Sequence, residues 1–253
     1  MNPYFEEEGC TIYNGDCREV IPTLNNVNLT VCSPPYNQLS SLLREPSGSW
    51  AEVGGGLNFV RNWQKAGYVD DLPEEEYQNR QNTIFGMVAT ASAIDSSLFY
   101  NHQIRWRDTE IIHPVKWFNP PLWNLREEII WARNGGMMMN ARMFCRFDER
   151  ILWFVRSDKW KWNQEAVGLG TVWNIACDQG RGKEHPVAYP EEIPARAISA
   201  VTDQGDLILD PFMGSGTTLR AAKNLGRRAI GIEIEEKYCE IAARRMAQKV
   251  MQF

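Results

Sequence analysis

The sequence predicts an α/β protein in which a mostly parallel central sheet is flanked by helices. Apolar runs at residues 206–210 and 228–233 are typical of buried strands, and the helix expected between them, at 217–225, ends at Gly226. A strand, a helix and a second strand of these lengths form a crossover unit, whose strands are parallel. With 253 residues, 43% of them hydrophobic, the chain can bury the core of one such domain. We therefore expect a single domain over residues 1–253.

The earlier elements follow from apolar runs and their boundaries. Residues 11–17 and 27–32 are predicted strands, and a helix at 18–24 between them ends at Asn25-Asn26. A long helix is expected from about residue 70 to 94, because a proline and three acidic residues suit its first turn. The other predicted elements are strands at 97–102, 126–133 and 150–156, a mixed helix and loop at 113–125, a helix from 190 with apolar positions up to 201, and a final helix at 235–250.

Two long segments lack regular structure in this prediction. Residues 37–68 are polar and rich in serine and glycine, and a loop of that length in a compact domain is usually functional or mobile. Residues 157–183 show no clear periodicity and are predicted to be irregular and surface-exposed.

Composition argues against several classes of protein. No run approaches the roughly 18 apolar residues of a membrane span, and the N-terminus lacks the basic and apolar regions of a signal peptide. The six cysteines are scattered without a Cys-x-x-Cys pair, which argues against a zinc site and for reduced thiols in a cytosol. We expect a cytoplasmic protein with no metal and no membrane partner.

Charge is distributed unevenly along the chain. The formal net charge of −5 alone argues weakly against a nucleic-acid partner. However, residues 1–100 are acidic, whereas residues 101–185 are locally basic and hold eight of the ten tryptophans. Such a surface suits a polyanion whose bases stack on aromatic rings. A structural role is the alternative for most of these tryptophans.

The strand at 27–32 runs directly into Ser33-Pro34-Pro35-Tyr36. Each proline fixes φ at about −65°, lacks an N–H and biases the preceding residue away from helix, so the strand ends in a stiff, extended corner. The carbonyls of Ser33 and Pro34 have few local donors there, and Tyr36 is held beside them. An ordinary strand-to-loop turn is the alternative interpretation.

A second candidate site is the turn from Asp210 to Thr218, which follows a strand and opens a helix. Backbone N–H groups at the helix start and a carboxylate at the strand end suit ligand binding there. The turn is not a dinucleotide fingerprint, since Leu219 holds the third glycine position, and it lacks the Lys-Ser/Thr of a P-loop. Glu233 ends the next strand, where a carboxylate accepts hydrogen bonds from ribose hydroxyls. We expect a ligand with a ribose but no required pyrophosphate.

Together these segments resemble the DNA amino-methyltransferases, which methylate exocyclic nitrogens of cytosine or adenine. Asp210–Thr218 matches the family's Asp-Pro-Phe-x-Gly-Ser-Gly-Thr-Thr signature, with Met213 where a small residue is more usual. Ser33–Tyr36 matches its (Asp/Asn/Ser)-Pro-Pro-Tyr signature, and residues 98–102 and 185–191 resemble further family blocks. The resemblance covers nearly the full chain. The catalytic signature precedes the cofactor signature, as in the circularly permuted beta subgroup.

The resemblance implies a Rossmann-like class I methyltransferase fold with S-adenosylmethionine as the cofactor. The catalytic residues that it implies are Ser33, Pro34, Pro35 and Tyr36. The Ser33 side-chain oxygen and the Pro34 carbonyl would hold the amine hydrogens and draw the nitrogen toward sp³, while Tyr36 stacks on a base rotated out of the duplex. The implied cofactor-binding residues are Asp16, Asp210, Phe212, Gly214, Ser215, Gly216, Thr217, Glu233, His185 and Pro186.

Three other features are given structural interpretations. Cys32 lies inside the strand, and ring-carbon methyltransferases need a Pro-Cys thiol, so we expect a buried cysteine rather than a nucleophile. Asn119-Pro120-Pro121-Leu122 resembles a second corner but lacks an aromatic fourth residue, and we expect a structural turn. His102 and His185 are expected to be structural or to flank the cofactor.

The target base and the DNA contacts follow from the same resemblance. Serine at position 33 goes mostly with N4-cytosine in the family and aspartate with N6-adenine, so cytosine is favoured and adenine is the alternative. Target recognition is expected from residues 134–183, inserted in the catalytic domain, with help from the loop at 37–68, which we place near the active site. Candidate phosphate contacts are Arg133, Arg142, Lys159, Lys161, Arg181 and Lys183, and a solvated surface charge is the alternative for each.

Double-stranded DNA is the expected partner of a protein of prokaryotic or phage origin. A homodimer and a separate restriction endonuclease are partner hypotheses, and no nuclease domain is expected in this chain. An RNA or protein amide methyltransferase is the less favoured alternative, because the protein amide enzymes favour Asn-Pro-Pro-Tyr and the unpermuted order. A non-catalytic nucleic-acid-binding subunit is disfavoured by the two intact signatures.

Overall fold

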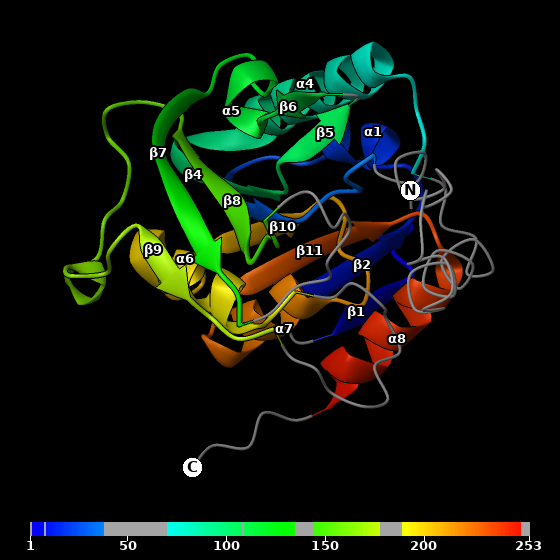
Figure 1. Cartoon of the computed structure of the whole chain (residues 1–253). Helices are drawn as coiled ribbons and strands as arrows, with labels where there is room; N and C mark the ends of the chain where they lie inside the picture. Colours follow the sequence, from blue (N-terminus) through cyan, green and yellow to red (C-terminus); the bar gives the residue numbers. More distant parts are fainter. Residues whose placement is uncertain are drawn as a thin grey trace.

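The protein has three layers, with helices on both faces of a central sheet (Figure 1). The computed structural model describes residues 2–7, 9–37, 70–107, 109–134, 144–177 and 189–248. Within them the sheet has the strand order β1-β2-β11-β10-β3-β4-β8-β7-β9. Its strands are β1 (Phe5–Glu7), β2 (Cys10–Asn14), β3 (Val27–Cys32), β4 (Ser92–His102), β7 (Asn124–Ala132), β8 (Asp148–Val155), β9 (Val172–Asn174), β10 (Leu207–Asp210) and β11 (Arg228–Glu233).

The central strands β2, β11, β10, β3 and β4 are parallel to one another. Consequently their carboxyl ends lie along one edge of the sheet, which we call the carboxyl edge. Strand β8 runs antiparallel between β4 and β7, so its amino end lies at that same edge. The confirmed fold is therefore a mostly parallel α/β sheet with one antiparallel strand in its second half and another, β1, at its border.

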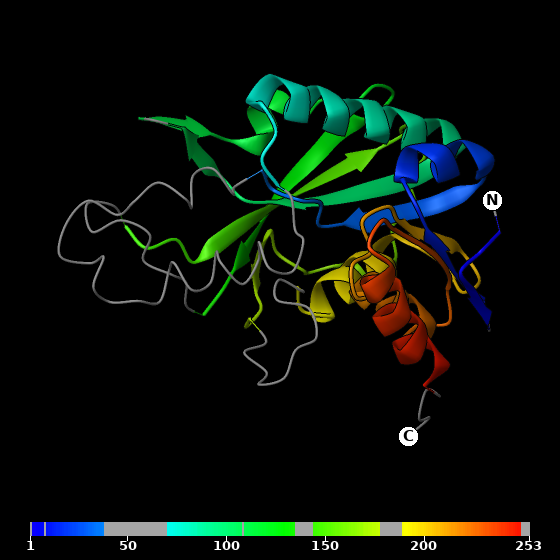
Figure 2. The same ribbon diagram turned by 90° about the vertical axis from the view of Figure 1, so that its right-hand side faces the viewer.

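Each face of the sheet is covered by its own group of helices. The long helix α4 (Glu74–Ala91) lies on one face with α1 (Cys17–Val20), and α6 (Glu192–Val201), α7 (Thr217–Asn224) and α8 (Glu236–Ala247) lie on the other (Figures 1 and 2). The buried side chains accordingly form two clusters, one per face. Because side chains alternate along a strand, Phe99 belongs to the α6–α8 face and its neighbours Leu98 and Tyr100 to the α4 face.

Several predicted boundaries are corrected by the structure. The helix at 18–24 is divided into α1 and the 3₁₀ helix η1 (Ile21–Thr23), because Pro22 has no N–H for an α-helical bond. Helix α4 ends at Ala91 rather than near residue 94. There Ser92 adopts an extended conformation and pairs with Val27 of β3, so β4 begins five residues before the predicted strand.

The prediction that residues 157–183 are irregular and surface-exposed is wrong in part. The segment contains the 3₁₀ helix η3 (Gln164–Ala166) and strand β9, and Ala166, Trp173 and Ile175 are buried. Strand β9 is three residues long and pairs with β7, whose residues come 42 positions earlier (Ile130 with Val172), so local periodicity gives no signal for it. Strand β1 is likewise three residues long, too short for a periodic signal, and so are the two strands of a separate hairpin, β5 (Arg105–Arg107) and β6 (Glu110–Ile112). Helix α5 (Pro114–Trp117) follows that hairpin.

None of the described helices combines the length and the apolar composition that crossing a membrane requires. Among the described residues, no group of three or more histidine, cysteine, aspartate or glutamate side chains is arranged to hold a metal ion.

Candidate functional site

The turn after β10 is built around the buried carboxylate of Asp210, which is 1% exposed. One of its oxygens accepts the Phe212 N–H at 3.1 Å and the other accepts the Thr218 hydroxyl at 2.5 Å, so the carboxylate joins the strand end to the first turn of α7. Tyr189 extends this chain, because its hydroxyl is hydrogen-bonded to that of Thr218. In this structure Asp210 holds the glycine turn in shape.

The glycines of the turn allow its tight path. Gly214 and Gly216 have φ of 51° and 80°, a region that favours glycine. A Cβ on Gly216 would lie 3.0 Å from the Ala242 Cβ of α8, so the turn also depends on close packing against that helix. Met213, unusual at its position in the family signature, is accommodated by Gly231 of β11: a Cβ on Gly231 would lie 2.3 Å from the Met213 sulfur.

The Glu233 carboxylate at the end of β11 holds the turn from the other side. Its Oε2 accepts the Gly214 N–H at 3.0 Å and its Oε1 accepts the Glu235 N–H at 2.9 Å. Burial raises the pKa of Glu233, although these backbone hydrogen bonds oppose the rise. Burial also raises the pKa of Asp210 to about 7, against the lowering effect of the Thr218 and Phe212 hydrogen bonds. Two carboxylates thus flank one glycine turn.

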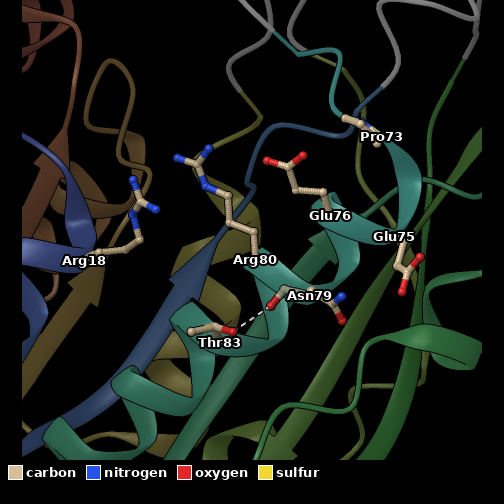
Figure 3. Close-up of a pocket in the computed structure, with 7 residues that line it drawn as sticks. All are labelled: Arg18, Pro73, Glu75, Glu76, Asn79, Arg80 and Thr83. Carbon is tan, nitrogen blue, oxygen red and sulfur yellow. Dashed lines mark hydrogen bonds between the residues drawn. The ribbon is translucent and has the colours of Figure 1, made fainter.

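Asp16 lies just beyond the end of β2, at the start of α1, and is held by Arg18. The Arg18 guanidinium donates to both carboxylate oxygens of Asp16, at 3.0 and 2.5 Å, and these hydrogen bonds lower the pKa of Asp16. Arg18 also lines a pocket of about 600 Å³ between α1 and the first turns of α4 (Figure 3). Because the pocket carries Arg18 and Arg80 together with Glu75 and Glu76, its charge does not select a ligand of one sign.

The Ser33–Tyr36 corner directly follows β3, next to β10 in the sheet. Asp70 fixes its far end, since its carboxylate accepts the N–H groups of Tyr36 at 3.0 Å and Asn37 at 2.5 Å. The Tyr77 hydroxyl lies 2.7 Å from the Pro35 carbonyl. No described residue donates to the Pro34 carbonyl, which agrees with the expectation that this carbonyl has few local partners.

A set of polar side chains, which we call the corner cluster, surrounds the Ser33 hydroxyl: it consists of Ser33, Tyr36, Asn101 and Glu149. The Ser33 and Tyr36 hydroxyl oxygens are 2.6 Å apart, and the Tyr36 hydroxyl donates to Glu149 at 3.0 Å. The Asn101 amide donates to Tyr36 at 2.7 Å and to Glu149 at 2.9 Å. Glu149 is 4% exposed and also pairs with the Arg133 guanidinium at 2.8 Å.

His102 and Cys32 are buried beside the corner, as their structural interpretations require. Burial and the nearby Arg105 charge lower the pKa of His102 to about 3, so the ring is neutral at physiological pH. Its centroid lies 4.7 Å from that of Tyr36, with the two ring planes tilted by 42°, so it packs against the tyrosine ring. Cys32 is fully buried and burial raises its pKa well above the ordinary value, so it stays a thiol, which confirms the buried-cysteine interpretation.

The carboxyl edge collects several of the predicted site residues and separates others from them. Strands that end there are followed by Asp16, the corner, the glycine turn and Arg133, and Glu233 is the last residue of another. Lys159 and Lys161 instead follow the carboxyl end of β8, at the opposite edge, where Lys161 pairs with Asp203 and Asp206. The predicted residues His185, Pro186, Arg142, Arg181 and Lys183 and the loop at 37–68, apart from Asn37, lie outside the described residues.

The second proline pair also lies at the opposite edge. Residues 119–122 precede β7, which runs in the same direction as β4, so they are remote from the corner. Pro121 packs closely on Gly86 of α4, and Leu122 has a φ of 69°. These contacts agree with the structural turn that the sequence predicts.

Sequence reasoning did not select Glu149, Asp70, Tyr77 or Asn101 as site residues. Asn101 lies in a segment that resembles a family block, and that was the available signal for it. Glu149 lies at the amino end of an antiparallel strand, and its contacts with Tyr36 span 113 positions. Only the sheet order brings it to the corner.

The sequence is similar to those of known DNA methyltransferases. Residues 27–244 match the N6/N4 family model described as DNA methylase, a family of S-adenosylmethionine-dependent methyltransferases. The type II methyltransferase M.BglII of Bacillus subtilis is 28% identical over 91% of this chain and 67% of its own length. The type II methyltransferase M2.LlaDCHI of Lactococcus lactis subsp. cremoris is 25% identical over 96% of this chain and 91% of its own length.

Solved structures share the fold. The PvuII DNA methyltransferase, titled cytosine-N4-specific, superposes with a TM-score of 0.69 at 15% identity and covers 99% of this chain and 90% of its own. The M1.HpyAVI–SAM complex has a TM-score of 0.63 at 22% identity, and the match covers 94% of this chain and 99% of the other. A structure titled as a putative DNA modification methylase of Thermus thermophilus, complexed with S-adenosyl-L-methionine, has a TM-score of 0.61 at 20% identity. The match covers 93% of this chain and 94% of the other.

Proposed function

The chain belongs to the N6/N4 DNA methylase family, and we propose that it is a site-specific type II enzyme that methylates the N4 amine of a cytosine rotated out of duplex DNA. The single observation that carries this proposal is the adjacency of two sites. The Ser33–Tyr36 corner follows β3 and the glycine turn follows β10, and these two strands are parallel neighbours. A base amine at the corner would therefore face a methyl donor held at the turn.

The corner supplies what an exocyclic amine needs. The lone pair of such an amine is delocalised into the ring, so the protein must hold its hydrogens and orient the nitrogen toward the donor. The Ser33 oxygen and the Pro34 carbonyl are the acceptors that we assign to this task. Tyr36 presents a half-buried ring, backed by His102, on which a base can stack.

The residues around the turn suit S-adenosylmethionine. Glycines at 214 and 216 leave the turn without side chains, so a ligand can approach the backbone at the start of α7. We assign the ribose to Glu233 and the adenine side to Asp16, with Phe212, Ser215 and Thr217 lining the turn. Both carboxylates already accept hydrogen bonds within the protein, so a ligand would share or replace those partners. When bound, this cofactor supplies an activated methyl group on a sulfonium.

Cytosine is favoured over adenine for two reasons. Serine at position 33 accompanies N4-cytosine in the resemblance described above, and the PvuII enzyme that shares the fold is titled cytosine-N4-specific. N6-adenine is the second candidate, because the family includes both amines. Double-stranded DNA is the proposed substrate, with Arg133 as a contact at the carboxyl edge. A homodimer and a separate restriction endonuclease are further proposals for partners of the intact enzyme.

Incubation with tritiated S-adenosylmethionine and mixed-sequence duplex DNA tests the activity, and mass spectrometry of the released nucleosides identifies the base. We expect N4-methylcytosine. Ser33→Ala and Tyr36→Ala should abolish transfer while cofactor binding persists. Asn119→Ala, the matched change at the exposed first residue of the second proline corner, should leave transfer intact. Absence of label in any DNA would refute the function, and N6-methyladenine would move the proposal to the second candidate.

A further inference from the structure

The corner cluster contains a buried carboxylate whose role the proposed function leaves unassigned. We propose that Glu149 is a positioning residue that fixes the direction of the hydrogen bonds at the corner, so that the Ser33 oxygen faces the target amine as an acceptor. This inference rests on the proposed function and assigns to it a residue on a different strand.

Four side-chain donors converge on the Glu149 carboxylate. Its Oε1 accepts from Gln103 at 3.1 Å and from Arg133 at 2.8 Å, and its Oε2 accepts from Tyr36 and Asn101. All four partners present N–H or O–H groups, so the carboxylate oxygens act as acceptors in every one of these bonds. The Tyr36 hydroxyl must therefore give its one hydrogen to Glu149.

The direction of the next hydrogen bond follows from that assignment. Once the Tyr36 hydrogen points at Glu149, the Tyr36 oxygen can take part in its 2.6 Å contact with Ser33 only as the acceptor. Ser33 then donates to Tyr36, and its own lone pairs face away from that bond. The Asn101 amide lies 3.4 Å from the Ser33 oxygen, which is long for a hydrogen bond and leaves those lone pairs largely available.

This arrangement answers a problem that serine poses at the corner. An aspartate there would accept amine hydrogens without assistance, whereas a hydroxyl can turn its hydrogen toward the amine and repel it. A chain of hydrogen bonds that ends on a carboxylate holds the serine hydrogen away. It also polarises the serine oxygen, because successive bonds in a chain strengthen one another.

Glu149→Gln is the decisive substitution, because it keeps the shape of the side chain and reverses the direction of the hydrogen bonds that lead to Ser33. Arg133 and Gln103 would hold the carbonyl oxygen of the new amide, so its NH₂ group would face Tyr36. The Tyr36 hydrogen would then turn toward Ser33 and occupy a lone pair. The Asn101 nitrogen would lose its acceptor at position 149 and keep the Tyr36 and Ser33 oxygens, at 2.7 and 3.4 Å.

We expect Glu149→Gln to lower kcat by about 10- to 100-fold, which is the effect of losing about one or two hydrogen bonds in the transition state. KM for DNA and the affinity for S-adenosylmethionine should change less than about twofold. In a Tyr36→Phe background, which has no hydroxyl to relay the effect, the same substitution should cost little more. The readouts are single-turnover transfer, cofactor binding and thermal unfolding of all four proteins in this cycle.

Asp148→Asn is the matched control, because it makes the same charge change one residue earlier. Its side chain pairs with Arg150 and has no bond to the corner cluster among the described residues. We expect its kcat to remain near that of the unsubstituted protein. An unchanged kcat for Glu149→Gln, or an equal loss in both backgrounds, would overturn the inference. If the unsubstituted protein methylates no DNA, the proposed function falls first and this inference with it.

Discussion

The buried carboxylate of Asp210 gives a prediction about stability. Its pKa is about 7, against an ordinary value of 3.8, mainly because it is buried. Below about pH 4 the group is protonated whether the chain is folded or unfolded, so it does not make folding stability depend on pH. Between about pH 4 and pH 7 only the unfolded chain ionises, so folding stability falls as the pH rises. Above about pH 7 the buried Asp210 carboxylate lowers the free energy of unfolding by its full amount, about 4 kcal/mol at most.

Asp210→Asn removes this pH-dependent cost and preserves the hydrogen bonds. The amide oxygen can accept the Phe212 N–H, and the amide nitrogen can donate to Thr218, whose hydroxyl then donates to Tyr189. Relative to the natural sequence, the variant should therefore gain about 2.5 kcal/mol between about pH 5 and pH 8. For a chain of this length that is a relative rise in Tm of about 5–10 °C.

Denaturant unfolding of the cofactor-free protein at several pH values measures the difference directly. Other carboxylates contribute equally to both proteins, so they cancel in the comparison. Glu192→Gln is a suitable control, because this exposed carboxylate pairs with Arg196 on the surface of α6 and its loss should cost under about 0.5 kcal/mol. A stability difference for Asp210→Asn that stays constant from about pH 5 to pH 8 would refute the reasoning.

Three further predictions concern packing and accessibility. Gly231→Ala should destabilise the protein by about 1–3 kcal/mol, because its Cβ would lie 2.3 Å from the Met213 sulfur, and adding Met213→Ala should restore part of the lost Tm. Asp70→Asn should cost about 1–3 kcal/mol and lower kcat, since an amide can accept only one of the two N–H groups held there; equal Tm and kcat would contradict this. A thiol reagent should label Cys145 and Cys177 of the native protein first, because the other four cysteines are buried, and fast labelling of more than two would oppose the structure.

The half of the site that we propose binds the cofactor was predictable because its signals are local. Strand β10, the glycine turn, α7 and β11 follow one another within residues 207–233, and each has its own sequence signal in apolar runs, glycines and a helix start. The structure places all of them as predicted. What the sequence did not reveal is that the Asp210 and Glu233 carboxylates are already hydrogen-bonded to the turn itself. Such contacts depend on side-chain positions that a pattern of residue types leaves open.

The half of the site that we propose binds the base was predictable only at the corner itself. Ser33–Tyr36 has a signature, but Asp70, Asn101 and Glu149 reach it from elements 34 to 113 positions away. Glu149 was beyond prediction because β8 is antiparallel, which reverses the rule that site residues follow strand ends. Similarly, Lys161 was proposed as a phosphate contact from its charge, and its pairing with Asp203 and Asp206 depends on the packing of residues 157–161 near the start of β10.

This difference in assembly leads to a final prediction. Apart from Asp16, the proposed cofactor half rests on one continuous segment, whereas the proposed base half needs the corner, α4, β4 and β8 to be in place together. Because regions of a fold open with different free energies, the half assembled from distant segments should be lost first as denaturant is added. Methyl transfer should therefore fall at a lower urea concentration than S-adenosylmethionine binding, measured on the same samples. Coincident loss of both, together with the loss of helical circular dichroism, would instead show one cooperative unit spanning the sheet.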